Sequence, residues 1–198
     1  MSKEVAVPEQ RDRMVAGAAD MLRRRGYNAT SVRELAKHTG APLGSTYHYF
    51  PGGKAQLAAE AVRLADGLIA RTLTRELAAG PIAGLRAFVA TWRGIVLDSD
   101  FQAGCPVLAV AVEEHPDLDA EPRHAAAAAF ARWTDLLAAA LREHGATIED
   151  AARTAALVVA AIEGSVAVCR AQRAIDPLDR IADALEAAVR AVLPAAPA

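Results

Sequence analysis

The chain has 198 residues, a formal net charge of −2 and two cysteines far apart, Cys105 and Cys169. Its length is enough for one large or two small domains, and two isolated cysteines exclude the disulfide framework of a small secreted protein. No apolar run is long enough to span a bilayer, and the N-terminus lacks the pattern of a secretory signal. We therefore expect a soluble, cytoplasmic protein with no membrane partner.

Hydrophobic residues make up 53% of the chain and aromatic residues only 5%, which favours a core of Ala, Leu and Val between closely packed helices. No alternating runs with hairpin turns indicate strands. Residues 1–54 carry nine Lys and Arg against five Asp and Glu, whereas residues 55–198 carry thirteen against nineteen. A basic head on an acidic body is typical of proteins that bind DNA through one end.

The first predicted helix covers about residues 10–25. Met14, Met21 and Leu22 recur on one face at helical spacing. Gly26 follows at the position where glycine commonly ends a helix, because glycine adopts left-handed dihedral angles without strain.

Two short helices joined by a tight turn are predicted between residues 30 and 54. Ser31 and Glu34 have the spacing of a capping box at the start of the first helix. Gly40 ends that helix, and Pro42 suits the first turn of the next one. The pattern predicts a helix-turn-helix, in which the second helix enters the major groove of DNA.

The second of these helices places five hydrogen-bonding side chains at consecutive positions, residues 45–49. A buried helix rarely tolerates such a density, because each polar group would need an internal partner. On DNA, hydroxyl and imidazole groups meet phosphates or base edges, and aromatic rings lie against sugars or thymine methyl groups. The alternative is a polar surface helix with two half-buried tyrosines.

Three of the candidate DNA contacts lie at helix starts, where free amides and side chains favour a phosphate oxygen. Thr30 and Ser31 would look identical in sequence if they were simple helix caps. Lys54 follows two glycines that let the backbone approach a ligand closely, and this favours contact with a phosphate. Arg33 is a candidate for guanine, with a solvated surface arginine as the alternative.

The run Tyr47–Pro51, followed by Gly52-Gly53-Lys54 and an apolar helix, resembles the signature of TetR-type transcriptional repressors. The pair of glycines before Lys54, and Gly104-Cys105-Pro106 further along, resemble the LmrA/YxaF-like branch of that family. The resemblance implies that His48 contacts a phosphate and that Tyr49 and Phe50 pack in the core. The predicted DNA-binding residues are Thr30, Ser31, Arg33, Ser45, Thr46, Tyr47, His48 and Lys54.

Six further helices are predicted from glycine, proline and apolar spacing, which gives an all-α fold of about nine helices. Their approximate ranges are 54–79, 82–98, 105–114, 121–144, 148–173 and 178–192. We expect an N-terminal helix-turn-helix domain at residues 1–55 and a C-terminal ligand-binding and dimerisation domain at residues 56–198.

The last two predicted helices carry apolar seams at helical spacing, which suit either an ordinary core or a contact between two copies. Palindromic operators require a two-fold dimer, and the TetR resemblance places the dimer interface on these helices as a four-helix bundle. The predicted interface residues are Ala155, Ile162, Val166, Leu178, Ile181, Leu185 and Val189.

A ligand cavity is predicted in the body, with apolar walls and one possible polar anchor, Glu163. An aromatic stripe at this spacing is also typical of a plain core. Cys105 is either a small buried hydrophobe or a redox-sensing thiol, and no adjacent Lys or Arg lowers its pKa. The predicted lining residues are Phe88, Trp92, Cys105, Leu108, Val112, Phe130, Trp133, Leu137, Val159 and Glu163.

The histidines are scattered, and no phosphate-binding loop, nucleophile elbow or metal-ligand pair is recognised. We therefore expect no enzyme activity, metal or cofactor. The sequence predicts a homodimeric transcriptional regulator, a repressor of an inverted-repeat operator that a small, largely apolar inducer releases from double-stranded DNA. The alternative is a helical carrier or protein-interaction module that does not bind DNA specifically.

Overall fold

The computed structural model of the chain describes residues 6–114 and 120–194, and these residues form helices and no strands. The prediction of an all-α fold is confirmed. The helical bounds are α1 Ala6–Arg25, α2 Val32–Thr39, α3 Leu43–Tyr49, α4 Gly53–Leu77, α5 Pro81–Asp98, α6 Pro106–Val112, α7 Glu121–Glu143, α8 Ile148–Gln172 and α9 Asp176–Ala191.

The helices group into two compact units. One contains α1–α3, the first part of α4, all of α6 and the start of α7, from residues 1–66 and 105–129. The other contains α5, α8, α9 and the remaining parts of α4 and α7, from residues 67–104 and 130–198. Thus α6 packs with the N-terminal helices, although α4 and α5 separate it from them in sequence.

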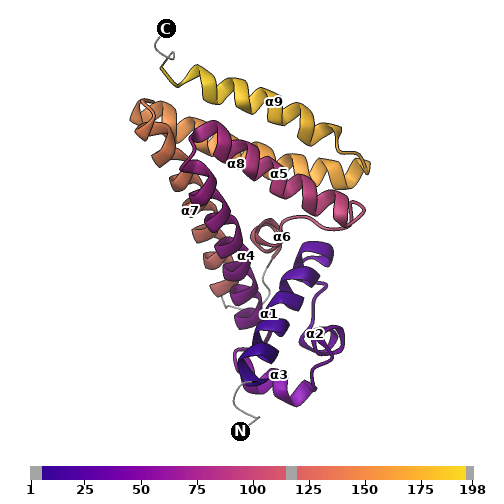
Figure 1. Cartoon of the computed structure of the whole chain (residues 1–198). Coiled ribbons are helices and arrows are strands. Elements are labelled where there is room, and N and C mark those ends of the chain that lie inside the picture. The colour runs from indigo at the N-terminus through magenta and orange to yellow at the C-terminus, as the bar shows by residue number, and fades with distance from the viewer. Residues whose placement is uncertain (1–5, 115–119, 195–198) are drawn as a thin grey trace. The chain divides into compact units, whose positions relative to one another are not determined.

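In the first unit, α1 packs against α2 and α6, and α3 follows α2 after a sharp turn (Figure 1). Its core consists of side chains that are almost fully buried, among them Met14, Leu22, Tyr27, Leu35 and Phe50. Phe50 comes directly after α3, so its burial fixes the end of that helix against the core. The opposite side of α3, which carries Tyr47, remains exposed.

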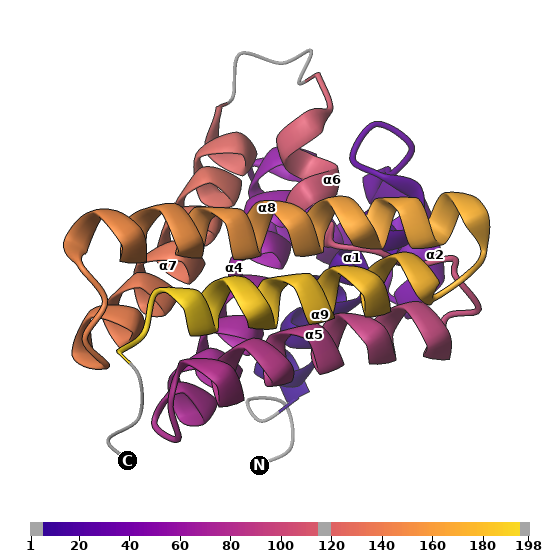
Figure 2. The same ribbon diagram turned by 90° about the horizontal axis from the view of Figure 1, so that it is seen from above.

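In the second unit, α5, α8 and α9 lie side by side (Figures 1 and 2). Exposed ion pairs join α5 to α9 at two places: Arg86 to Glu186 (2.7 Å) and Arg93 to Asp179 (3.0 Å). Hydrogen bonds from Arg86, and next from Arg190, lower the pKa of the Glu186 carboxyl to about 2. Such exposed pairs contribute little stability, so apolar packing between the three helices holds this unit together.

Helix α8 is the one described helix that is long and apolar enough to cross a membrane. Half of its most apolar window is buried inside the protein, against α5 and α9. Ala155, Ile162 and Val166 are among its buried side chains. Its apolar character therefore matches that of a core helix.

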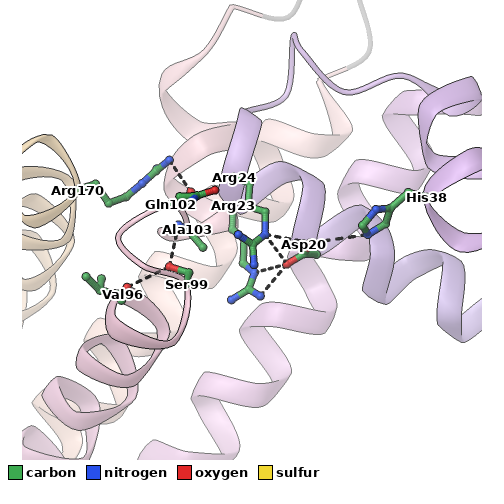
Figure 3. Close-up of polar contacts among 9 residues, drawn as sticks. All are labelled: Asp20, Arg23, Arg24, His38, Val96, Ser99, Gln102, Ala103 and Arg170. Carbon is green, nitrogen blue, oxygen red and sulfur yellow. Dashed lines mark hydrogen bonds and ion pairs between the residues drawn. The ribbon is translucent and has the colours of Figure 1, made fainter. Parts of the chain in front are cut away.

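Hydrogen bonds hold the segment that follows α5 (Figure 3). The Ser99 hydroxyl donates to Val96 O (3.1 Å) and accepts from Ala103 N–H (3.0 Å). Arg170 of α8 donates to Gln102 O (3.1 Å), and a Cβ on Gly104 would lie 3.0 Å from the same arginine. The glycine of the Gly104-Cys105-Pro106 motif therefore makes room for the Arg170 side chain.

Candidate nucleic-acid interface

The segment Ser31–Tyr49 forms the predicted helix-turn-helix. Ser31 caps α2: its hydroxyl accepts from Glu34 N–H (3.2 Å) and donates to the Glu34 carboxylate (3.0 Å). Gly40 ends α2 in the left-handed region (φ 65°), and Pro42 precedes α3 with extended dihedral angles. The capping chemistry predicted from the sequence therefore sets the geometry of the turn.

Helix α3 presents one face to solvent and one to the core. Tyr47 is 56% exposed, His48 is exposed and Ser45 is half-buried. Thr46 is fully buried, and its hydroxyl donates to Pro42 O (3.4 Å). This argues against the predicted DNA contact of Thr46: within the polar run it is the position that faces the core, and its side chain supports the helix.

Thr30 is also directed inward. It is buried, and its hydroxyl donates to Gly26 O (2.7 Å) across the connection between α1 and α2. These contacts argue against its predicted role as a phosphate contact and favour that of a residue that closes the turn. Ser31 remains half-exposed with its hydroxyl engaged in the cap.

Lys54 lies at the start of α4, where Gly53 takes a φ of +64° that suits glycine. The Lys54 ammonium lies 4.2 Å from the centroid of the Tyr27 ring and donates to Asn28 O (3.4 Å). The contacts hold this cation beside the start of the helix-turn-helix. Arg33 is exposed on the first turn of α2, where its long side chain can reach outward.

The run Arg23-Arg24-Arg25 at the end of α1 is partly neutralised (Figure 3). Arg23 and Arg24 donate to the Asp20 carboxylate at 2.7 and 3.1 Å, and His38 of α2 lies 3.7 Å from it. Partial burial acts to raise the pKa of Asp20, but the bonds from Arg23 and Arg24 outweigh it and the pKa is lowered. These arginines therefore mainly support α1.

Sequence reasoning missed three features of this region. Leu43 and Gly44 are exposed on α3 beside Tyr47, and the i, i+4 spacing of Leu43 and Tyr47 could have shown this shared face. It also missed the contact of Glu113, whose carboxylate accepts hydrogen bonds from the backbone N–H groups of Tyr27 and Asn28. No local pattern could have indicated that contact, because more than eighty residues separate the partners.

Comparison with known proteins shows to which family this chain belongs. Residues 15–61 match the family model of the bacterial regulatory proteins of the tetR family, and residues 81–184 match the C-terminal domain of LmrA/YxaF-like transcriptional regulators. The chain belongs to the TetR family. Its LmrA/YxaF-like branch, predicted from the glycine pair and the Gly104-Cys105-Pro106 motif, is confirmed.

Relatives of similar length support the same assignment. An uncharacterised HTH-type transcriptional regulator of Mycobacterium tuberculosis is 40% identical over 188 residues, covering 93% of this chain and 96% of the relative. The HTH-type transcriptional regulator LmrA of Bacillus subtilis is 29% identical over 180 residues, covering 89% and 95%. A regulatory protein TetR from Rhodobacter sphaeroides shares the fold, with a TM-score of 0.79 at 24% identity over 89% of this chain and 97% of that one.

This TetR-family protein is therefore a DNA-binding transcriptional regulator, and its family is one of regulators rather than of enzymes. TetR regulators bind DNA and form dimers. The helix-turn-helix lies within residues 15–61, the part that matches the family model of the tetR regulatory proteins.

The residues predicted to form the dimer interface lie on α8 and α9, but most face inward. Only Ile181 is half-exposed; the others are 0–3% exposed within a single protomer: Ala155, Ile162, Val166, Leu178, Leu185 and Val189. Within the protomer, α8 and α9 pack against each other and against α5. This argues against these residues as the contact with a second copy, because a side chain already buried in the protomer adds little surface there.

The predicted ligand-lining residues divide between the two units. Phe88, Trp92, Phe130 and Trp133 form one aromatic cluster, with ring centroids 5.4–6.3 Å apart in successive pairs. Leu137, Val159 and Glu163 are buried in the same unit. Cys105, Leu108 and Val112 lie in or beside α6; the Cys105 sulfur caps that helix by accepting from Leu108 N–H (3.4 Å). Val112 is 70% exposed, which removes it from an enclosed lining.

Proposed function

We propose that this TetR-family regulator represses transcription in the cytoplasm by binding a short inverted-repeat operator as a homodimer. The supporting observation is the outward face of α3, where Ser45, Tyr47 and His48 project from a helix that Phe50 anchors in the core. Hydroxyl, phenol and imidazole groups suit base edges and phosphates in the major groove. Ser31, Arg33 and Lys54 add contacts at the flanks, within a DNA-binding domain at residues 1–55.

The homodimer contact is proposed on the exposed face of α8, the face opposite its buried seam. Leu157 and Val168 are 49% and 42% exposed there, and small residues lie between them. The residues of this exposed α8 face are Leu157, Ala160, Gly164, Ala167, Val168 and Ala171. Small side chains let two helices approach closely, and the exposed alanines of α9, such as Ala184 and Ala187, can extend the contact.

Selection of bound sequences from a random double-stranded DNA pool tests the operator proposal. The expected result is an inverted repeat whose half-sites lie about 34–36 Å apart or a multiple of that spacing. Retention that depends on salt but selects no sequence would support the alternative of a helical module without specific DNA binding.

Lys54→Ala is expected to weaken operator and non-specific binding by a similar factor, roughly threefold to tenfold at moderate salt. A lost phosphate contact also lowers the slope of log affinity against log salt by about one. Titration of operator and scrambled duplexes at several salt concentrations measures both quantities. Lys37→Ala is the matched control, because Lys37 is an exposed lysine in the last turn of α2, whereas Lys54 lies at the start of α4. A lysine contact that read bases would instead reduce operator binding alone.

A small, largely apolar inducer is proposed to bind at the aromatic cluster and release the dimer from DNA. Trp92 is 1% exposed and its indole N–H has no acceptor among the described residues. A buried donor of this kind favours a ligand that carries a hydrogen-bond acceptor beside its apolar surface. Buried Glu163 is a second polar group in the same unit.

Inducer binding is expected to change tryptophan fluorescence, because Trp92 and Trp133 lie in the cluster and are the only tryptophans. A ligand screen that reads this emission, followed by an operator-release assay, measures binding and induction separately. Operator and inducer must weaken each other's binding by the same factor, since linkage is reciprocal.

Trp92→Phe keeps the apolar contact and removes the donor, so it should weaken the binding of a ligand with an acceptor by about tenfold. Ligands that bind without changing operator affinity would refute the proposed induction and leave the proposed operator binding untouched.

A further inference from the structure

A single carboxylate holds the turn that leads into the helix-turn-helix. Glu113, the residue after α6, accepts a hydrogen bond at Oε1 from Tyr27 N–H (3.0 Å) and at Oε2 from Asn28 N–H (2.7 Å). Two successive amides that point at one carboxylate form a small anion-binding concavity. Hydrogen bonds to a charged acceptor are stronger than those between neutral groups.

Gly26 is adapted to this contact in two ways. Its φ of +85° lies in the left-handed region, and a Cβ added there would lie 1.9 Å from Glu113 Oε1. A larger residue at this position would therefore push the carboxylate off the amides even if the backbone tolerated it. The glycine that ends α1 in the sequence also makes room for a side chain from another helix.

The same turn also holds the Lys54 side chain, through a backbone carbonyl and an aromatic ring. Asn28 offers its N–H to Glu113 and its carbonyl to Lys54, and the Lys54 ammonium also lies over the Tyr27 ring. Thr30 closes the turn by donating to Gly26 O, and Ser31 follows as the cap of α2. One short turn thus connects Glu113 with two of the groups that flank the proposed DNA surface.

We propose that Glu113 is a positioning residue for operator binding: its carboxylate fixes the turn Gly26–Thr30, and the turn places Lys54 and the start of α2 against DNA. The inference rests on the proposed operator binding by the helix-turn-helix. Glu113 itself does not touch DNA, and as an anion it would weaken attraction to phosphate if charge alone mattered. Positioning and simple electrostatics therefore predict opposite signs when the charge is removed.

Glu113→Gln in the full-length protein is the test. The amide keeps the length of the side chain but presents an N–H₂ group to one of the two donors, so the turn loses a contact. We expect operator affinity to fall about tenfold while circular dichroism shows a fully folded protein at the assay temperature. NMR should show faster hydrogen exchange at the amides of Tyr27 and Asn28. Glu114→Gln is the matched control: it removes the same charge from the next, exposed residue and should change affinity less than twofold.

A second pair of variants tests the contact independently. Gly26→Ala should weaken operator binding strongly, and combining it with Glu113→Ala should cost less than the sum of the two single changes, because the collision disappears. Wild-type operator affinity in Glu113→Gln, or unchanged exchange at both amides, would overturn the positioning role. If the wild-type protein selects no operator, the proposed function is refuted as well. If the wild-type protein binds an operator and Glu113→Gln binds it equally well, only the positioning role of Glu113 is refuted.

Discussion

Gly164→Glu is expected to convert the protein to a monomer and to reduce operator affinity by at least a hundredfold. Gly164 lies in the middle of the exposed α8 face, and a Cβ added there meets no atom within 4 Å apart from its chain neighbours and the adjacent backbone of its own helix. The variant protomer should therefore fold normally. Two glutamates brought together across a two-fold contact would bury charges without partners, which opposes association.

The loss of operator affinity follows from the geometry of an inverted repeat. When one DNA-binding domain of the dimer is bound, the other is held close to its half-site. This linkage raises affinity by about 10²- to 10⁴-fold over a single domain. A monomer loses that gain although its helix-turn-helix is intact. Sedimentation at micromolar concentration and operator titration measure the two effects on the same sample.

Gly94→Glu provides the matched control for Gly164→Glu. Gly94 is also a helical glycine, on α5, and a Cβ added there likewise has no neighbour within 4 Å. The two variants carry the same change in charge and helix propensity at different surfaces. A dimeric Gly164→Glu protein that binds operator normally would exclude the exposed α8 face as the contact.

Local chemistry explains why the helices could be predicted from the sequence. Gly26, Gly40 and Gly145 all take positive φ at helix ends, and Ser31 and Thr147 accept hydrogen bonds as N-caps. Each signal acts within a few residues, so it can be recognised without knowledge of the tertiary structure. For the same reason the predicted helical limits fall within about four residues of those observed.

The side that each residue faces was harder to predict. Thr46 was grouped with its polar neighbours, although the helical period turns it towards the core, where its hydroxyl finds Pro42 O. On α8 and α9 the apolar seam was assigned to the dimer, but an apolar helix between two neighbours has a buried seam and an exposed small-residue face. Periodicity shows that a face is apolar and leaves open which partner covers it.

Contacts that are distant in sequence were not predictable. The Glu113 carboxylate reaches the Tyr27 and Asn28 amides across more than eighty residues. Backbone amides carry no side-chain signature, so only the fold shows that they point at a carboxylate.

Tyr47→Ala is expected to reduce operator affinity about thirtyfold to a hundredfold and to leave non-specific binding within about threefold. The Tyr47 side chain is 56% exposed on α3, so its removal costs little packing in the free protein. Base contacts of a recognition helix are worth about 1–3 kcal/mol each, whereas non-specific binding depends on phosphate contacts. The ratio of the two affinities is therefore the quantity that should change.

Tyr47→Phe separates the two parts of the side chain. If the phenol hydroxyl donates to a base or phosphate, this variant should lose roughly half of the binding free energy that Tyr47→Ala loses; if the ring packs on a thymine methyl group, it should bind as well as the parent. His38→Ala serves as the control, because His38 is an exposed ring at the end of α2 that contacts Asp20. Operator titration with a scrambled duplex in parallel gives each affinity, and thermal unfolding confirms equal stability. Parent-like affinity in Tyr47→Ala would mean that the outward face of α3 reads DNA through its other residues, Ser45 and His48.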